Sequence, residues 1–566
     1  MAKKIIIIGG VAAGMKTASR LRRLDKNAQI TVLDRGTCVS FSACGFPYYV
    51  GGDVASFDSL LGGVQGKRDP EFFKEVKGFD VLIKHEATKI NRDKKTVSVV
   101  NLETKKEFEL EYDKLVLATG STPVKLPIPG SDLKGVHNFW FPEEAFRVRK
   151  DVESGKIKDV VIVGAGLIGI ELAEAFHKQG VKVHIVEMQN RILPQLLDLD
   201  LADKVKKPLI EAGIDLHLEE KTLSFEGSET VEAVKTDKGI IPAQMVIVCV
   251  GVRPNVELAK DAGLKIGVSG AIEVNKRLQT SDPDIFAGGD CAENTHRISK
   301  MKFFAPMGST ANKHGRVIAN NIAGKCTSYP GILLTGVCKV LDWEAGCTGL
   351  NSVTAEAAGI DYECVVVAGK DRLGYMPGAN MLILKLYAEK GTRKVLGVQA
   401  VGEGGVAKRV DVIATAITFG ATLDDLSTLD MAYAPPFNAA VDNISTAANV
   451  LINKMECQIG SMNCEDFKEV RKKPEVTFVD VRTPSEFKET HISGCCNIIN
   501  LPLDKIRAEA EKVLTDKNAK YITACMVNLR GSEGEVILKA KGYTHTSSLE
   551  GGLAAWPYET ECEKNK

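Results

Sequence analysis

The sequence predicts an α/β protein of several domains that contains two dinucleotide-binding units. Two copies of a strand, glycine turn, helix and strand pattern occur, and an acidic residue follows each turn by about 20 positions. The chain of 566 residues is too long for one hydrophobic core, so three or four domains are expected. Gly is abundant at 52 residues, as expected where strands turn tightly into helices.

The charges and cysteines narrow the class of protein. Lys plus Arg equal Asp plus Glu at 73 each, which gives no sign of a nucleic-acid partner. The 14 cysteines show no CxxC and no Cys/His zinc spacing, so we expect a reduced, cytoplasmic enzyme without a metal site. The apolar run that follows the N-terminus stops at glycines after four isoleucines. It is therefore read as a strand, and no membrane partner is expected.

The first copy of the pattern spans residues 4–34. A buried strand over 4–8 enters the turn GGVAAG, a helix covers 13–24, and a second strand over 29–33 ends at Asp34, 20 positions after Gly14. Glycines at Gly9 and Gly14 let backbone amides approach a pyrophosphate at a helix N-terminus, and the acid accepts ribose hydroxyls. Val11 stands where the middle glycine is usual.

The second copy matches the full pattern. Gly164, Gly166 and Gly169 form the turn, and Glu187 follows Gly169 by 18 positions. Two such copies in one chain predict two bound dinucleotides. A carboxylate that accepts both ribose hydroxyls repels a 2′-phosphate, so NADH is favoured over NADPH, although the nearby Arg191 leaves NADPH open.

Two further segments carry a resemblance to a known family. YDKLVLATG at 112–120 and TSDPDIFAGGD at 280–290 resemble the flavoprotein disulfide reductases, and the resemblance covers residues 1 to about 453. It implies an FAD-binding domain over 1–112 and 245–325 with an inserted NAD-binding domain over 113–244. The residues it assigns to FAD are Gly9, Gly14, Asp34, Arg35, Thr119, Gly120 and Asp290, and those it assigns to NAD are Gly164, Gly166, Gly169 and Glu187.

Two cysteines follow the first unit, and either a redox pair or a single reactive thiol would explain them. Five residues separate Cys38 from Cys44. On a helix the two thiols would lie about 240° apart, and a disulfide needs Cα atoms within roughly 7 Å. A pair is therefore disfavoured, but it stays open if the segment is a loop.

The stretch SFSACGFPYY resembles the single-cysteine branch of the same family, which includes coenzyme A-disulfide reductases, persulfide reductases, NADH oxidases and peroxidases. The resemblance implies that Cys44 is a redox thiol beside the flavin, with its thiolate stabilised there. The first turn lacks the histidine of the peroxidase type. Ala43 replaces the usual asparagine, which leaves the preferred substrate open.

Basic residues could receive the phosphates of coenzyme A. Lys16, Arg20 and Arg23 share one face of the first helix. The resemblance adds Ser40 and, by a loose alignment, Lys77. A solvated helix face explains the three helical cations equally well.

Residues 326–453 resemble the α+β dimerisation domain of this branch. Tyr375 in LGYMPGA and Tyr433 in MAYAPPFN match tyrosines that, in coenzyme A-disulfide reductases, reach the partner's cysteine and can protonate a leaving thiolate. We therefore expect a homodimer with shared active sites. Buried tyrosines beside proline turns are the alternative.

Residues 455–566 resemble a rhodanese domain of α/β type. The DVR motif at 480–482, Glu486-Phe487 and His491-Ile492 are present, and Cys525 begins a loop that reaches Arg530 and leads into a helix. Amides at a helix N-terminus stabilise a persulfide anion on such a cysteine, and Arg530 either assists or braces the loop. Asn528 replaces the usual glycine, and asparagine tolerates a left-handed backbone.

Together these expectations describe an NADH-oxidising, FAD-dependent reductase of coenzyme A disulfide, coenzyme A persulfide or polysulfide that releases sulfide. Its partners would be small sulfur compounds, with Cys525 as an acceptor of sulfane sulfur. Two alternatives are an NADH oxidase with an independent sulfurtransferase, and a redox sensor or sulfur-relay protein.

Overall fold

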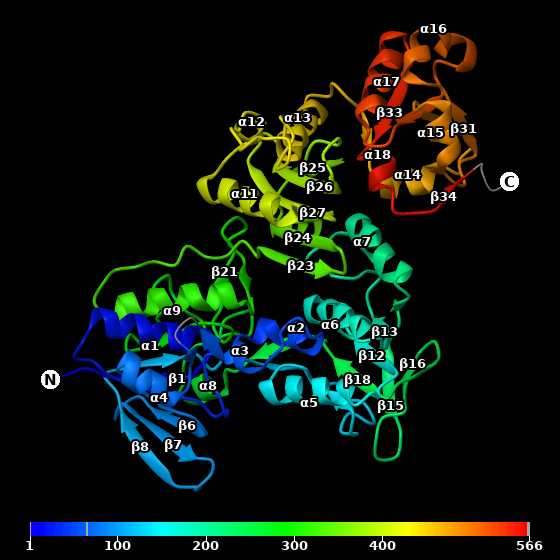
Figure 1. Cartoon of the computed structure of the whole chain (residues 1–566). Coiled ribbons are helices and arrows are strands. Elements are labelled where there is room, and N and C mark those ends of the chain that lie inside the picture. The colour runs from blue at the N-terminus through cyan, green and yellow to red at the C-terminus, as the bar shows by residue number, and fades with distance from the viewer. Residues whose placement is uncertain (1, 64–65, 563–566) are drawn as a thin grey trace. The chain divides into compact units, whose positions relative to one another are not determined.

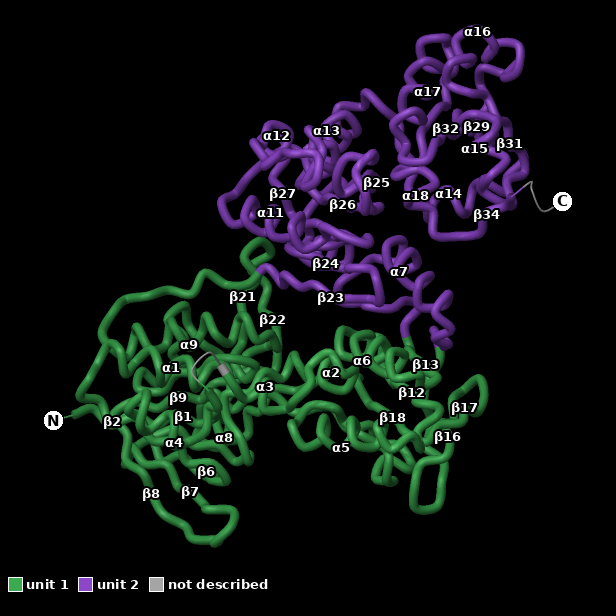
Figure 2. The backbone as a smooth tube through the Cα atoms, viewed as in Figure 1, with its two compact units in different colours: residues 1–188, 220–332 green, residues 189–219, 333–566 purple. Residues whose placement is uncertain are grey.

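The computed structural model describes residues 2–63 and 66–562, which form two compact units. Unit 1 comprises residues up to 188 and 220–332, and unit 2 comprises 189–219 and the chain from 333 onward (Figure 2). The two units are described separately. The predicted last domain runs to residue 566, and its residues 563–566 lie outside the described part.

The first sheet of unit 1 is parallel and follows directly from the first sequence pattern. Its order is β20-β9-β1-β2-β5, and the strand β1 is buried along its isoleucines because helices and a second sheet cover both faces. Helices α1 (Ala12–Leu24) and α9 (Gly308–Ile322) pack together on one face (Figure 1). The strands are β1 (Lys4–Ile8), β2 (Gln29–Leu33), β5 (Asp80–Leu82), β9 (Lys114–Leu117) and β20 (Ile285–Ala287).

An antiparallel sheet of three strands covers the other face. Val97 and Val99 point into a core that also contains Leu115 and Leu117 of β9. Its alternating outer residues are exposed, as expected of a sheet with one solvated face. The strands are β6 (His85–Asn91), β7 (Thr96–Asn101) and β8 (Glu107–Glu111).

The second parallel sheet of unit 1 follows from the second sequence pattern. Strands β11, β18, β12 and β13 lie side by side in that order, and α6 (Leu167–Lys178) packs against β12 and β13. Helix α5 (Pro142–Glu153) precedes them, and an antiparallel sheet of three strands follows. The strands are β11 (Val136–His137), β12 (Asp159–Val163), β13 (Lys182–Glu187), β15 (Thr222–Glu226), β16 (Ala233–Thr236), β17 (Ile240–Pro242) and β18 (Met245–Val248).

Two strands near the ends of the predicted second domain belong to different sheets. The range 113–244 was expected to form the second domain, yet β9 belongs to the first sheet and β18 to the second. In the division into two compact units, residues 189–219 belong to unit 2. Buried ion pairs hold them there, since Lys385 binds Asp198 at 3.1 Å and Asp200 at 2.9 Å.

Unit 2 contains an antiparallel sheet in the order β23-β24-β27-β26-β25, so β25 is an edge strand. Helix α7 (Leu199–Glu211) contacts β27, while α11 (Val406–Phe419), α12 (Leu423–Ser427) and α13 (Asn443–Met455) cover a core of aliphatic side chains. The strands are β23 (Gly336–Val340), β24 (Trp343–Gly349), β25 (Tyr362–Lys370), β26 (Met381–Glu389) and β27 (Val395–Gly402).

The last domain of unit 2 is a parallel sheet in the order β28-β33-β32-β29-β31. The DVR motif forms a fully buried ion pair between Asp480 and Arg482 at 2.7 Å. Its strands are β28 (Ser461–Met462), β29 (Val476–Asp480), β31 (Asn497–Asn500), β32 (Lys520–Ala524) and β33 (His545–Leu549), and its helices are α14 (Cys464–Val470), α15 (Pro484–Glu489), α16 (Leu503–Val513), α17 (Leu529–Ala540) and α18 (Gly552–Ala555).

One carboxylate of this last domain covers the edge strand of the preceding sheet. Glu550 is 2% exposed and accepts hydrogen bonds from the Val366 amide of β25 at 3.0 Å, from Lys454 Nζ at 2.8 Å and from Ser461 Oγ at 2.7 Å. A carboxylate thus satisfies an outward amide that an uncovered edge would offer to another chain.

Among the described residues, no helix combines the length and the apolar character that crossing a bilayer demands.

Candidate functional site

The first dinucleotide cradle has the geometry that its glycines predict. A Cβ at Gly9 would collide with the carbonyl oxygen of Ala118, and one at Gly14 would collide with that of Gly9. Asp34 accepts the Gly10 amide at 2.7 Å through one oxygen and the Gly36 amide at 2.7 Å through the other. Burial raises the pKa of Asp34, and these two amides act in the opposite direction.

The second cradle repeats this arrangement. A Cβ at Gly164 or Gly169 would strike backbone oxygen atoms, whereas one at Gly166 would enter open space. Glu187 accepts the amide of Ala165 at 2.9 Å, as Asp34 accepts that of Gly10. Each cradle therefore holds its acid beside the start of a helix. In the second cradle, the open space at Gly166 leaves room for a phosphate.

The segments between the cradles meet at an asparagine that the sequence analysis missed. Asn255 Nδ2 donates to the carbonyl of Thr119 at 2.8 Å. The backbone carbonyl of Asn255 accepts the Thr119 hydroxyl, and its side-chain Oδ1 accepts the Thr122 hydroxyl, each at 2.7 Å. Strands β10 (Ser121–Pro123) and β19 (Val252–Pro254) pair beside it. The segment GVRPN at 251–255 was the available signal.

Asp290 lies where the resemblance expects a flavin contact, just after β20. Ser121 Oγ donates to Asp290 Oδ2 at 3.0 Å. Burial raises the pKa of Asp290, and the hydrogen bond from Ser121 lowers it in part. Arg35 lies 4.0 Å from Glu86 in an exposed ion pair. Together with the first cradle, these groups fit a flavin dinucleotide, and the second cradle fits a nicotinamide dinucleotide.

Cys44 lies on a short 3-10 helix, η1 (Ala43–Gly45), which continues into α2 (Phe46–Val50). Desolvation raises the pKa of its thiol, and the carboxylates of Glu171 and Asp290 raise it further. These charges of the protein itself oppose the thiolate that the sequence analysis expected.

Cys38 occupies a different environment. Both cysteines are free, but residues 38–42 are not helical and Ser40 has a φ of 56°. The helical argument against a pair was therefore wrong in its premise. Burial and the charge of Glu143 raise the pKa of the Cys38 thiol to about 11, which makes it a poor nucleophile at neutral pH.

A half-buried acid near Cys44 was not predicted. Glu171 lies on α6, two positions after Gly169, and Tyr48 of the PYY motif donates to it at 3.4 Å. Burial raises the pKa of Glu171 to about 7, although the Tyr48 hydrogen bond acts in the opposite direction. Tyr48 and Glu171 line a small recess together with Pro47 and Asp53. A group that titrates near neutrality there can exchange protons with its surroundings.

The five residues predicted for coenzyme A have mixed environments. Arg20 Nε donates to Asn320 Oδ1 at 3.1 Å, and Arg23 Nε to the Ser19 carbonyl at 3.1 Å, with Arg23 exposed. Lys16 and Ser40 are half-buried. Lys77 lies over the ring of Phe72, with Nζ 5.2 Å from the centroid.

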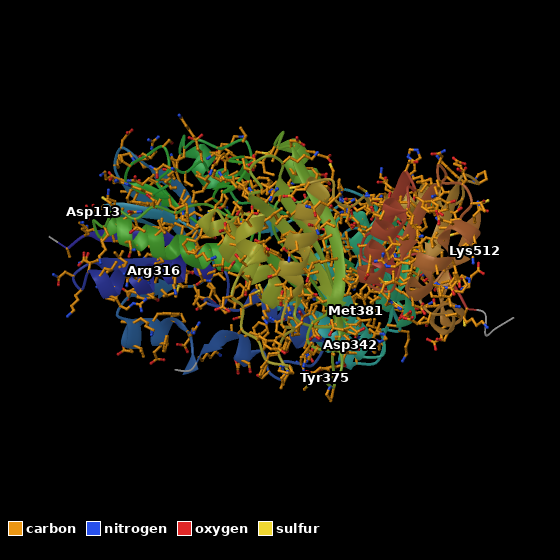
Figure 3. All side chains as sticks on the ribbon, turned by 90° about the horizontal axis from the view of Figure 1, so that it is seen from above. Asp113, Arg316, Asp342, Tyr375, Met381 and Lys512 are labelled. Atoms are coloured by element: carbon orange, nitrogen blue, oxygen red, sulfur yellow. The ribbon has the colours of Figure 1, made fainter. Side chains whose placement is uncertain are left out.

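The two predicted tyrosines are exposed, with 73% of Tyr375 and 52% of Tyr433 accessible. Figure 3 shows Tyr375 at the lower edge of the view. The alternative that they are buried beside proline turns is therefore wrong. Their phenols are available to a second molecule.

The Cys525 loop joins β32 to α17. Cys525 is 1% exposed, and Asn528 adopts the left-handed backbone that was predicted, with a φ of 68°. The carbonyls of Cys525 and Met526 accept the amides of Leu553 at 3.1 Å and Ala554 at 2.8 Å. Each of these carbonyl oxygens is directed at an amide outside the loop and not at the N-terminus of α17, where its partial negative charge would oppose a bound anion.

Arg530 braces this loop against α15. Its two terminal nitrogens donate to the carboxylate of Glu486 at 2.9 and 2.6 Å. This pair lowers the pKa of Glu486 to about 2 and raises that of Arg530, to which the Cys525 thiol also contributes. Both roles considered for Arg530, bracing and assistance to the thiol, are compatible with this geometry.

Comparison with known proteins defines the class. Residues 3–308 match the family model of pyridine nucleotide-disulphide oxidoreductases, residues 335–444 match the dimerisation domain of that family, and residues 463–558 match the rhodanese-like domain. The chain belongs to the pyridine nucleotide-disulphide oxidoreductase family and carries a C-terminal rhodanese-like domain. Members of this family use FAD and a pyridine nucleotide.

Individual relatives narrow the class further. A solved structure described as an NAD-dependent persulfide reductase from A. fulgidus is 40% identical, covers 98% of this chain and all of its own, and has a TM-score of 0.93. The reduced CoADR-RHD of Bacillus anthracis is 32% identical, covers 98% of both chains and has a TM-score of 0.92.

Two curated relatives match about four fifths of the chain. The NAD(P)H sulfur oxidoreductase (CoA-dependent) of Pyrococcus furiosus is 39% identical over 449 residues, which is 79% of this chain and 99% of the relative. An NADH oxidase of Methanocaldococcus jannaschii is 37% identical over 454 residues, which is 80% of this chain and 99% of the relative.

Proposed function

We propose that this protein is an NADH-dependent reductase of sulfane sulfur carried on coenzyme A, with polysulfide and coenzyme A disulfide as related substrates. The observation that carries the proposal is the single Cys44 thiol on η1 after the first cradle, in a chain that also holds a persulfide-type loop at Cys525. Relatives described as persulfide and coenzyme A-dependent sulfur reductases support it.

The reaction at Cys44 balances without a further reactant. The Cys44 thiolate attacks the coenzyme A sulfur of a persulfide, a Cys44–S–S–CoA bond forms, the S–S bond of the persulfide breaks, and HS⁻ leaves. FAD, when bound, supplies the two electrons that it receives from NADH. Those electrons and one proton return Cys44 to the thiolate and release coenzyme A thiol.

The chain's own residues would hold and serve these groups. We assign FAD to the first cradle with Asp290, and NADH to the second cradle with Glu187, whose carboxylate disfavours a 2′-phosphate. Glu171 can hold a proton while its Oε1 accepts the hydrogen bond from Tyr48. We assign the coenzyme A phosphates to Lys16, Arg20 and Arg23 on α1, together with Ser40 and Lys77.

A homodimer would complete the site. The predicted dimerisation domain exposes Tyr375, Tyr433, Phe419 (83%) and Phe437 (74%), and aromatic side chains are enriched at protein–protein interfaces. We propose that Tyr375 and Tyr433 reach the Cys44 site of the partner subunit, where a phenol can protonate the leaving thiolate. Reduced thiols and NADH are cytoplasmic chemistry, so we place the protein in the cytoplasm.

Cys525 would accept sulfane sulfur as a persulfide and deliver it to the coenzyme A thiol. The helix N-terminus of α17 and the guanidinium of Arg530 favour the anion Cys525–S–S⁻. This step moves a sulfur atom between thiols and changes no net oxidation state.

Anaerobic turnover tests the proposal. We expect NADH oxidation with coenzyme A persulfide, stoichiometric sulfide release, loss of that activity in Cys44→Ser and retention in Cys38→Ser. Equal loss in both variants would support a paired mechanism instead. If NADH is consumed only when oxygen is present, the chain is an NADH oxidase, as the name of the M. jannaschii relative suggests. Turnover of only a few equivalents per flavin with every acceptor would indicate a sensor or relay.

A further inference from the structure

The two tyrosines lie on loops that are far apart in sequence. Tyr375 belongs to the loop 371–380 between β25 and β26, and Tyr433 belongs to the loop 428–442 between α12 and α13. Both side chains are exposed, so their own packing does little to place them. The position of each phenol therefore depends on how the backbone of its loop is held.

One buried arginine holds both loops. Arg409 on α11 is 1% exposed, and its Nη2 donates to the carbonyl of Asp371 at 2.9 Å, the first residue of the Tyr375 loop. The same nitrogen donates to Asn438 Oδ1 at 3.0 Å and to Asp442 Oδ2 at 2.8 Å, both in the Tyr433 loop. Its Nε also donates to Asp442 Oδ2 at 3.1 Å.

Each group that Arg409 contacts is itself tied to its loop. Asn438 is 1% exposed, and its Nδ2 donates to the carbonyl of Ala432 at 3.3 Å, directly before Tyr433. Asp442 accepts the amide of Ile444 at 2.8 Å and so caps α13.

The first loop is closed in the same way. Asp371 is 3% exposed, and its Oδ1 accepts the amide of Asn380 at 2.9 Å, which joins the two ends of the loop 371–380. The chain of contacts thus runs from one guanidinium to the base of each tyrosine loop.

We propose that Arg409 is the positioning residue that sets Tyr375 and Tyr433 together for the step at Cys44. This inference rests on the function proposed above for the two tyrosines. Arg409 presents Nη2 to all three acceptors and Nε to Asp442 as well, whereas the ammonium of a lysine would lie one atom short of the Nη2 position and has no second nitrogen to hold Asp442. Arg409 touches no substrate, and it acts through the loops.

The test compares Arg409→Lys with Lys408→Gln, which removes a positive charge from an exposed neighbour on the same helix. We expect Arg409→Lys to lower kcat for anaerobic reduction of coenzyme A persulfide by about 10- to 100-fold, since small displacements of acting groups have effects of this size. The KM for NADH and the rate of ferricyanide reduction by NADH, which bypasses the tyrosines, should stay at the parental values. Lys408→Gln should match the parent in every assay.

Double variants separate positioning from general damage. If Arg409 acts through the phenols, Arg409→Lys should add little to the loss already caused by Tyr433→Phe or Tyr375→Phe. Asn438→Ala disturbs only the Tyr433 loop, so it should be non-additive with Tyr433→Phe and additive with Tyr375→Phe. This second variant keeps the test decisive if Arg409→Lys does not fold.

The outcomes distinguish this inference from the function on which it rests. If both tyrosine variants keep the parental rate, the proposed role of the tyrosines fails, and the role of Arg409 fails with it. If the tyrosine variants lose activity while Arg409→Lys and Asn438→Ala do not, only the positioning role is overturned. Full additivity of Arg409→Lys with both tyrosine variants also overturns it.

Discussion

The contact between the two domains of unit 2 can be tested by replacing a single oxygen atom of Glu550. Its carboxylate binds the Val366 amide of β25, Lys454 and Ser461, and it is 2% exposed. The change Glu550→Gln keeps one oxygen, which can still accept from Lys454 and Ser461. The amide nitrogen then faces the Val366 N–H, so that two donors meet and neither is satisfied.

The expected cost follows from these contacts. The hydrogen bond from the charged Lys454 is weakened, and the buried N–H of Val366 loses its acceptor. Together these losses amount to about 2–4 kcal/mol of local stability. If local opening governs exchange, that loss corresponds to about 30- to 900-fold faster hydrogen exchange at the amide.

Hydrogen exchange of peptides that contain residues 362–370 is the assay, and Glu533→Gln on the exposed side of α17 is the matched control. We expect fast exchange at Val366 in Glu550→Gln alone, while the amides that pair β25 with β26 keep the parental rate. Exchange at Val366 within threefold of the parent would refute the reasoning, because it would mean that the carboxylate does not protect the edge strand.

Three further predictions follow from the site. The folded-state pKa of Glu171 is about 7 against an ordinary 4.5, so the native state binds more protons than the unfolded state between these pH values. The stability of the parent therefore falls as pH rises through this window. In thermal melts, Glu171→Gln should be more stable than the parent by up to about 3 kcal/mol at pH 8, but not at pH 4. Glu187→Ala should reduce the preference for NADH over NADPH in kcat/KM by about tenfold, and an unchanged ratio would remove Glu187 from cofactor selection. Arg530 lowers the pKa of Glu486 to about 2, so the stability that this pair adds is present above pH 4.5 and disappears as pH falls toward 2. In acid unfolding, the stability of Glu486→Gln should therefore be lower than that of the parent above pH 4.5 and equal to it near pH 2. A stability difference that stays constant with pH would contradict the ion pair.

Local signals in the sequence predicted much of the fold. The strands 4–8 and 29–33 have the predicted bounds, and the first helix differs by one residue, because a buried parallel strand that ends at glycines has few alternatives. The left-handed Asn528 was predicted for a similarly local reason. The sequence motifs also led to the correct family.

Residues whose importance depends on distant partners could not be predicted. Asn255, Arg409 and Glu550 act through atoms that lie 136, 38 and 184 positions away in the sequence. The sheet that β9 joins could not be predicted for the same reason, since it depends on pairing with β1 and β20. The argument about the spacing of Cys38 and Cys44 assumed a helix, whereas the chain turns at Ser40.

Residues 189–219 belong to unit 2, whereas the segments before and after them belong to unit 1, and this limits how the chain can be cut into separate fragments. The backbone passes between the two units after residues 188, 219 and 332, so no single cut separates them. A protease that nicks only the last of these connections would leave α7 covalently attached to unit 1. The buried carboxylates of Asp198, just before α7, and of Asp200 within it would stay bound to Lys385 of the other fragment. The nicked halves should therefore remain associated until a denaturant releases them.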